Sequence, residues 1–418
     1  MEPMLNHTGM KRMKHLNLIW ILCLFAQGGL AQSFGQNKVQ YNVFDWSFIS
    51  STHFDIYYYQ DEKHIAKFTA EEAENSYEQI SKHLRWTLKD RVSIIVYLSH
   101  NDFQQSNVTQ AYMVEGVGGV TELYKNRVVI PFEGNYEQFR HVIHHELVHA
   151  MINDMVYGGS LQNMVSRQVK TRLPLWANEG LAEFLSMNWD TEADMILRDL
   201  AINEYIPAIE ELDYFLAYKG GQSVWRFIAQ KYGREKIGEI FWEIHTSQST
   251  EKGFKRVLGM DFEDLTNQWH KYLKKEYWPD VKDRDEIEDI AKRLTDHEKE
   301  KNFMNLSPAL SPDGSRIAVL SDRLGHTDIY LLDAIDGTEI KRLVKGNRSL
   351  DFEELKWLQP GLSWSPDSKS IVVAAKAGKG DVLHIIDVKT KKSQKIETGN
   401  LWRKLKKPRN YGDRFEVV

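Results

Sequence analysis

The chain has 418 residues, of which 42% are hydrophobic and 27% are charged, and its formal net charge is −5. This length allows two or more domains with separate cores, and the composition is ordinary for a globular protein. The acidic balance, together with the lack of a basic stripe interleaved with aromatic residues, argues against a nucleic-acid-binding protein.

The first 31 residues have the features of a secretory signal peptide. Their basic region contains Lys11, Arg12 and Lys14. Residues 18–26 form an unbroken apolar run, and residues 29–31 (G-L-A) place small side chains at positions −3 and −1 of a cleavage site. The run is too short to cross a bilayer comfortably, so a cleaved signal is favoured over an anchor. We therefore expect export, with no transmembrane segment in the mature chain.

The single cysteine, Cys23, lies inside this apolar run. Leu22 before it does not suit a lipoprotein cleavage site, so removal of residues 1–31 would leave no cysteine and no disulfide. An exported protein without cysteines is typical of the bacterial periplasm or extracellular space. We expect the mature chain to depend for its stability on its core and on any metal that it binds.

Residues 32–279 are predicted to form one domain that begins with strand, helix, strand. Residues 53–59 alternate and are rich in aromatic side chains, residues 61–88 have apolar positions near helical spacing, and residues 91–98 form a strongly apolar strand. The glycines of residues 116–119 do not have the G-x-G-x-x-G spacing, and no helix follows them, so a phosphate-binding loop is disfavoured.

Residues 120–124 and 127–132 are predicted to form a hairpin at an exposed sheet edge. An exposed edge strand of this kind can pair with an extended peptide substrate, which is β-augmentation. The other interpretation is that the hairpin is only part of the sheet. The residues alone favour neither interpretation.

Residues 135–157 are predicted to form a helix that carries H-E-x-x-H at residues 145–149 and ends at the glycines that follow. Positions four apart lie on one helical face, so His145 and His149 can bind one metal ion together. Glu146 is then placed to take a proton from a metal-bound water. Such a pattern can also arise by chance in a helix with a polar face, but a second motif downstream favours metal binding.

The second motif lies in a predicted helix at residues 175–184 and contains the candidate third ligand, Glu179. A zinc hydrolase needs three protein ligands and one open coordination position. Glu183 lies one turn away on the same face, where it could accept a hydrogen bond from the non-ligating nitrogen of a histidine ligand; we place Asn178 beside the ligands as well. Glu183 could instead be a surface carboxylate or part of a helix-stabilising pair, and Glu179 and Glu183 could exchange roles.

The remaining candidates are two histidines and a tyrosine. His141 and His144 have no glutamate placed as Glu146 is, so we expect them to flank or support the site without a catalytic role. The chain from the second motif to residue 278 is predicted to be helix-rich, with breaks at residues 218–221 and 232–233. Tyr218 is a candidate donor to the developing oxyanion, the alternative being a core tyrosine.

Residues 280–302 are densely charged with almost no apolar face, which predicts a linker between domains. Beyond it, residues 311–314 (S-P-D-G) match residues 365–368 (S-P-D-S), and residues 328–333 match residues 382–387 at the same offset. Each unit has a turn, two strands and a polar turn, the outline of a propeller blade.

Two blades cannot close a ring, because propellers typically have about 4 to 8. We expect residues 303–418 to be an incomplete propeller, either in a fragment of a longer protein or completed by another chain. Residues 400–418 are basic and lack the pattern of a third blade, which fits a truncation. This region is expected to be less stable alone than residues 32–279.

The two-part metal motif resembles that of the gluzincin metallopeptidases, and most closely the peptidase MA-like family. It reads H-E-L-V-H at residues 145–149 and W-A-N-E-G-L-A-E at residues 176–183, and the resemblance covers about residues 45–275. Residues 53–57 and 119–122 resemble the opening strand of that family and the segment before its active helix.

This resemblance implies an α+β zincin-like domain, with a small mixed sheet, packed helices and a helical C-terminal half. It implies one Zn²⁺ held by His145, His149 and Glu179, with Glu146 as the general base. The connection between the motifs is longer than in the aminopeptidase branch, so the amine-binding residues of that branch are not implied. Residues 303–397 resemble the WD40-like blades of TolB-type propellers, which implies an all-β region after the first domain.

The function expected from these patterns is that of an exported zinc metallopeptidase. Its partners would be a protein or peptide substrate and a further protein recruited by the propeller, with no nucleic acid. The alternative, from another class, is a catalytically inactive periplasmic scaffold that uses the propeller for protein interaction.

Overall fold

The computed structural model describes residues 38–108, 113–123, 125–158, 173–280, 285, 287–358 and 361–397. The predicted signal peptide and the predicted truncated end, residues 400–418, lie outside these ranges. The chain divides after Val39, and the fold described below begins at Gln40. Among the described residues, no helix is both long and apolar enough to cross a membrane.

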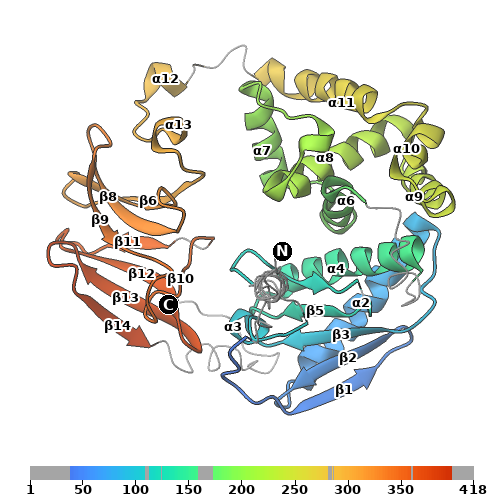
Figure 1. The fold of residues 1–418 in the computed structure, drawn as a ribbon, viewed down its shortest axis with the longest axis horizontal. Coiled ribbons are helices and arrows are strands. Elements are labelled where there is room, and N and C mark those ends of the chain that lie inside the picture. Colours follow the sequence, from blue (N-terminus) through green and yellow to red (C-terminus); the bar gives the residue numbers. More distant parts are fainter. Residues whose placement is uncertain are drawn as a thin grey trace, which may run out of the picture. The chain divides into compact units, whose positions relative to one another are not determined.

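A five-stranded mixed sheet forms the first layer of the fold (Figure 1). Its strands in spatial order are β1 (Trp46–Ser50), β2 (Phe54–Tyr59), β3 (Val92–Tyr97), β5 (Val128–Pro131) and β4 (Val120–Thr121). The three central strands are parallel, whereas β1 and β4 run antiparallel to their neighbours. The predicted hairpin is therefore present, with shorter strands, and β4 lies at an edge of the sheet.

Two long helices cover one face of this sheet. They are α2 (Lys63–Leu84) and α4 (Tyr136–Tyr157), which pack against each other and against the central strands. Successive strand residues point to opposite faces, so Ile56, Ile94 and Ile130 enter the core beneath the helices. Tyr59 and Tyr97 lie on the other face, against the one-turn helix α3 (His100–Phe103), which the sequence did not predict.

The chain from residue 175 to residue 280 is rich in helices, as predicted. Its helices are α6 (Leu175–Met187), α7 (Thr191–Ile202), the 3₁₀ turn η1 (Ile209–Glu211), α8 (Tyr214–Tyr232), α9 (Glu235–Ser247), α10 (Thr250–Leu258), α11 (Phe262–Tyr277) and the 3₁₀ turn η2 (Trp278–Asp280). The predicted break at residues 232–233 is confirmed, because α8 ends at Tyr232. The predicted break at residues 218–221 is wrong, because α8 continues through Gly220 and Gly221.

The glycines that suggested a break instead allow α6 and α8 to approach closely. A Cβ atom on Gly180 would overlap the backbone of Gly221, and a Cβ atom on Gly221 would overlap the carbonyl oxygen of Trp176. The indole Nε1 of Trp225 on α8 donates to the carbonyl oxygen of Ala177 at 3.0 Å. The two helices are therefore in near backbone contact, which places residues 218–219 of α8 beside the metal motif of α6.

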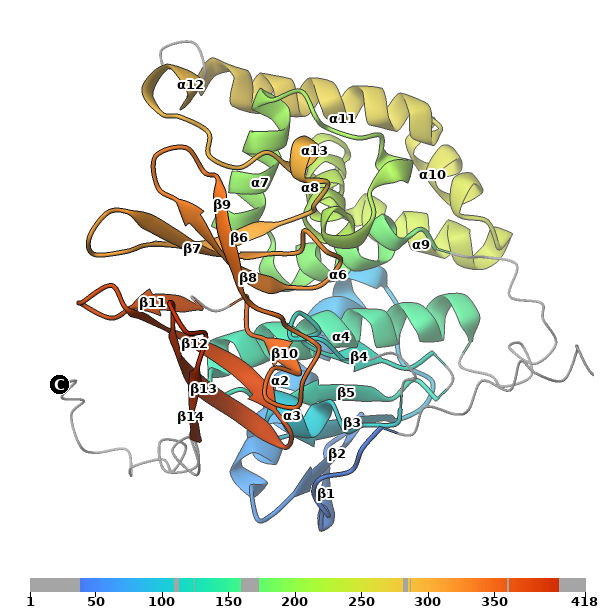
Figure 2. The same cartoon turned by 60° about the vertical axis from the view of Figure 1, so that its left-hand side comes forward.

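The C-terminal region is built from two antiparallel sheets, coloured orange to red in Figure 2. Two short helices, α12 (Ile287–Ile290) and α13 (His297–Glu300), precede them in the predicted linker. The first sheet contains β6 (Asn305–Leu310), β7 (Arg316–Ser321), β8 (Asp328–Asp333) and β9 (Glu339–Val344). The second contains β10 (Glu354–Leu355), β11 (Leu362–Trp364), β12 (Ser370–Ala377), β13 (Gly380–Asp387) and β14 (Ser393–Glu397).

The repeated sequence gives a repeated local structure in these sheets. The hydroxyl of Ser311 donates to Asp313 at 2.6 Å, and the hydroxyl of Ser365 donates to Asp367 at 2.7 Å in the equivalent turn. Apolar residues of both sheets form one shared core. The predicted fold class, an α+β domain followed by an all-β region, is confirmed.

Candidate metal centre

Helix α4 holds the H-E-x-x-H residues in fixed positions. The side chain of Asn135 accepts hydrogen bonds from two first-turn N–H groups, and Gly158 ends the helix with φ of 68°. Its middle turns are enclosed by other elements, so His145, Glu146 and His149 are only 8%, 5% and 8% exposed. Polar side chains that are this buried need polar partners, and the partners of the two histidines are Glu179 and Glu183 on α6.

Three donor atoms from α4 and α6 converge on one point. Nε2 of His149 lies 3.2 Å from Nε2 of His145 and 3.1 Å from Oε2 of Glu179. The third side of the triangle, from Nε2 of His145 to Oε2 of Glu179, measures 3.4 Å. His145, His149 and Glu179 therefore form a group that could hold a metal ion.

The spacing of this triangle fits a zinc ion. Zinc binds imidazole nitrogen and carboxylate oxygen at about 2.0–2.2 Å in tetrahedral geometry, which separates neighbouring ligand atoms by about 3.3–3.6 Å. The observed separations, 3.1 to 3.4 Å, lie at or just below this range. Two imidazoles and one carboxylate are also the donor set of many catalytic zinc sites.

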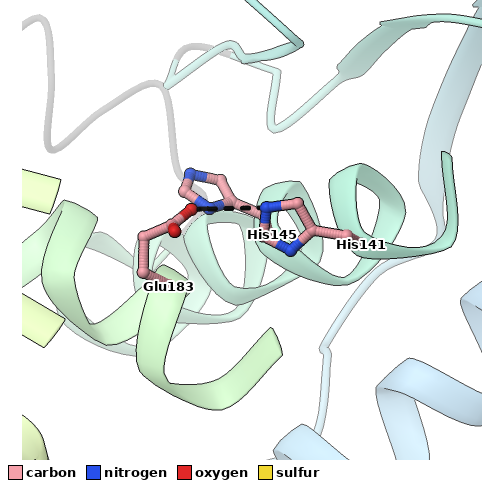
Figure 3. Close-up of side chains that lie close together, drawn as sticks. All are labelled: His141, His145 and Glu183. Carbon is pink, nitrogen blue, oxygen red and sulfur yellow. Dashed lines mark ion pairs between the residues drawn. The ribbon is translucent and has the colours of Figure 1, made fainter. Parts of the chain in front are cut away.

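A second group shares His145 with the first (Figure 3). Oε1 of Glu183 lies 3.0 Å from Nδ1 of His145 and 3.4 Å from Nε2 of His141, so both rings face one carboxylate. The approach to His145 is close enough for an ion pair, although it is not aligned as a hydrogen bond. His141, His145 and Glu183 thus form another candidate metal site, on the opposite side of the His145 ring from Glu179.

The carboxylates dominate the electrostatics around His145. Burial alone would lower the pKa of His145, but Glu179 and Glu183 outweigh it and raise that pKa to about 10. Burial likewise would raise the pKa values of the two carboxyl groups, yet the facing histidines hold both well below the usual range. Both glutamates are therefore ionised and suited to bind or orient cations.

Glu146 points toward the edge strand β4. The hydroxyl of Thr121 donates to Oε2 of Glu146 at 2.6 Å and also lies 2.9 Å from its carbonyl oxygen. A Cβ atom on Gly119 would come within 2.7 Å of Oε1 and 2.9 Å of Cγ of Glu146. The strand therefore positions the carboxylate of Glu146 through Thr121 and leaves it room through Gly119.

Tyr218 lies beside the same histidine. Its ring stacks on that of His145, with centroids 6.1 Å apart and planes inclined by 13°. Burial raises the pKa of Tyr218, and the nearby charges of Glu179 and Glu146 raise it further, so its hydroxyl keeps its proton. Tyr218 can therefore act as a hydrogen-bond donor at the site.

The structure places two other predicted residues less centrally. Asn178 is half-buried on α6, and its side chain makes no hydrogen bond to the histidines or glutamates of either group in the described part of the chain. His144 is buried but belongs to neither group, and burial lowers its pKa to about 4. The roles given to the site residues from sequence stay predictions.

Sequence reasoning missed two residues that contact the site. Lys219 donates to Oε2 of Glu183 at 2.9 Å, and Thr121 donates to Glu146 as described above. The sequence did carry a signal for Lys219, since it is a lysine among small and aromatic residues next to Tyr218. The burial of Lys219 depends on the close approach of α8 to α6. A helix break at residues 218–221, as predicted, does not imply that approach.

Comparison with known proteins supports the assignment of this region. Residues 72–275 match the family described as the Peptidase MA superfamily. The match runs from within α2 to the last turns of α11 and includes both groups around His145. No curated protein matches the chain.

Among solved structures, the C-terminal region is similar to part of TolB from Acinetobacter baumannii. The two chains are 28% identical over the aligned part, which covers 22% of this chain and 21% of TolB, with a TM-score of 0.18. The chain thus spans about a fifth of the length of that protein.

Proposed function

Since residues 72–275 form a domain of the Peptidase MA superfamily, we propose that this protein is a zinc-dependent metallopeptidase of the gluzincin type. Its substrates would be proteins or peptides. The observation that carries the proposal is the convergence of donor atoms from His145, His149 and Glu179 beside the buried carboxylate of Glu146.

We assign the metal to the group that contains Glu179. Among the described residues, Glu179 forms ion pairs only with histidines, whereas Glu183 also forms an ion pair with Lys219. When bound there, zinc would supply a Lewis acid that acidifies water and polarises a carbonyl oxygen. The open side of the triangle would receive the substrate.

Glu146 is the general base of the proposed reaction. It would accept a proton from the attacking water and later deliver it to the leaving amine. Thr121 holds Oε2 of this carboxylate, and Gly119 keeps side-chain atoms away from Oε1. A carboxylate fixed in this way transfers a proton without first reorganising.

Tyr218 and β4 complete the proposed site. The protonated hydroxyl of Tyr218 would donate to the oxygen that gains charge at the scissile carbonyl. In the described sheet, β4 pairs with β5 on one side only, which leaves its other edge for an extended substrate. Substrate bound there would lie next to Thr121 and hence next to Glu146.

We further propose that the protein acts outside the cytoplasm and that its β-sheet region recruits substrate or a partner protein. The signal-like residues 1–31 support export, and the repeated blades support a role in protein interaction. Expression in a bacterium, followed by N-terminal sequencing of the protein from each cell fraction, tests the first part. A chain that keeps residues 1–31 and stays with the cytoplasmic fraction would contradict it.

The enzymatic proposal is tested with a peptide library and mass spectrometry of the products. Wild-type protein loaded with zinc is compared with Glu146→Gln, and Glu137→Gln, an exposed position on the same helix, serves as the control. We expect cleavage by wild type and control, and a loss of at least about 1,000-fold in Glu146→Gln. Tyr218→Phe is expected to lower kcat by about 100-fold.

Each outcome of this test is informative. Zinc bound by wild type and by Glu146→Gln, with no cleavage that depends on Glu146, would support the inactive scaffold instead. Turnover left intact by Tyr218→Phe would remove Tyr218 from the reaction and leave the rest of the proposal standing.

A further inference from the structure

Lys219 is a buried charge that the proposed reaction does not use. It lies on α8, directly after Tyr218, and is 6% exposed. Its ammonium group contacts three carboxylates, those of Glu183 at 2.9 Å, Asp190 at 3.3 Å and Glu192 at 3.3 Å. A buried lysine is costly unless it is paired, and the three carboxylates supply that pairing.

We propose that Lys219 is a positioning residue that acts through Glu183 on the metal ligand His145. The two oxygens of Glu183 have different partners: Oε2 binds the ammonium of Lys219, and Oε1 faces Nδ1 of His145. The hydrogen bond from Lys219 fixes Oε2, and the ion-pair contact with Nδ1 keeps Oε1 facing the imidazole ring.

This fixed carboxylate decides which nitrogen of His145 is available to a metal. A neutral imidazole carries its proton on one nitrogen and offers a lone pair on the other. Glu183 favours the proton on Nδ1, which leaves the lone pair on Nε2, the atom that faces Glu179 and His149. Carboxylates that bind ligand histidines in this way commonly change metal affinity by about 10- to 100-fold.

The same lysine explains why the second group would not compete for metal. A divalent cation between His141, His145 and Glu183 would lie beside the ammonium group of Lys219 and be repelled by it. The carboxylate of Glu183 already neutralises that ammonium group. Lys219 would therefore direct a single zinc ion to the group that contains Glu179. This inference rests on the proposed zinc site.

A purely structural role for Lys219 predicts something different. Asp190 caps α7 by accepting from the N–H of Ala193 at 2.9 Å, and Lys219 could serve only to join α7 to α8 through Asp190. In that case its removal would destabilise the fold but leave the zinc affinity of the folded protein unchanged. Metal affinity and stability must therefore be measured separately.

The experiment measures zinc affinity by competition with a chromophoric chelator in wild type, Lys219→Met, Glu183→Gln and the double variant. Lys231→Met, an exposed lysine on the same helix, is the matched control. Thermal unfolding of the metal-free proteins reports the structural effect. The visible absorption spectrum of bound Co²⁺ reports the geometry of the ligands independently of turnover.

We expect Lys219→Met to weaken zinc binding about tenfold and to alter the Co²⁺ spectrum, while Lys231→Met matches wild type. In the Glu183→Gln background the change at Lys219 should alter the affinity less than twofold, because Lys219 acts through Glu183. Lys219→Arg, which keeps the charge, should recover most of the affinity. If Lys219→Met does not fold, Lys219→Gln replaces it under the same criteria.

Two results would overturn the inference. One is unchanged zinc affinity in folded Lys219→Met, and the other is an additive effect of Lys219→Met and Glu183→Gln. A wild-type protein that binds no zinc would instead contradict the proposed function, so the two failures are distinguishable.

Discussion

Two candidate metal-binding groups, each with two histidines and one glutamate, lie side by side in this protein, and they differ in the residues around them. His141, His145 and His149 are spaced by one turn on α4, and Glu179 and Glu183 are spaced by one turn on α6. Each glutamate therefore faces two histidines, and His145 belongs to both groups. Only the carboxylate of Glu183 also binds a lysine.

This difference shows that donor type and distance do not by themselves assign a metal. Both groups have two imidazoles and one carboxylate in reach of one another. Among the described residues, the charge of Glu179 forms ion pairs only with histidines, and this group lies next to Glu146 and Tyr218. The charges around each group, rather than the types of ligand, distinguish the group that we expect to bind metal from the group that orients its ligands.

The largest expected effect separates the two groups directly. His149→Ala removes a ligand from the first group and should weaken zinc binding by at least about 100-fold. His141→Ala removes a member of the second group only and should weaken zinc binding less than threefold. Chelator competition at equal protein concentration measures both. The opposite ranking would assign the metal to Glu183.

A second variant should disturb both groups together. Gly180→Ala introduces a methyl group that overlaps the backbone of Gly221, which forces α6 away from α8. We expect the free energy of unfolding to fall by about 3 kcal/mol and zinc binding to weaken as Glu179 and Glu183 move. Gly380→Ala, where the methyl group would meet open space, should change stability by less than about 0.5 kcal/mol. Urea denaturation measures the free energy of unfolding of both variants. Equal stability of the two variants would refute the close contact between Gly180 and Gly221.

The zinc affinity should depend on pH because His145 lies between two carboxylates. These raise the pKa of His145 to about 10 in the metal-free protein, so at neutral pH zinc must displace a proton from its ring. Lowering the pH adds that proton and weakens binding, by about tenfold per pH unit below pH 10. Calorimetry at pH 6.5 and 7.5, in buffers with different ionisation enthalpies, should show release of about one proton. An affinity that is the same at both pH values would contradict this coupling.

The smallest expected effect concerns Glu146 rather than the metal. Thr121→Val removes the hydroxyl that holds Oε2 of Glu146 and keeps the shape of the side chain. The loss of one hydrogen bond to a charged group should lower kcat about three- to tenfold. Zinc affinity should stay within twofold of wild type. Steady-state kinetics decides the matter, and a fall in zinc affinity would mean that Thr121 acts on the metal centre instead.

Much of the site follows from short-range sequence patterns. The spacing of His145 and His149, and that of Glu179 and Glu183, depends only on helical periodicity, and both helices are present. The edge position of β4 also follows from a local hairpin signal. Patterns of this kind involve residues only a few positions apart in the sequence, so they can be recognised without knowledge of the fold.

The parts that were not predicted depend on contacts between distant segments. The sequence predicts a helix break at residues 218–221, because the glycines there lower helical propensity. In the structure Gly221 faces Gly180 across two packed helices, and this contact outweighs the propensity. The same contact brings Lys219 to Glu183, so the role of Lys219 could not be predicted without knowing that α6 and α8 touch.

The most direct test of this account is the position of the metal itself. Crystals of the zinc-loaded Glu146→Gln protein, measured at the zinc absorption edge, give an anomalous peak for each bound ion. We predict one peak about 2.0–2.2 Å from Nε2 of His145, Nε2 of His149 and an oxygen of Glu179. A peak between His141 and Glu183, or no peak at either group, would contradict the account.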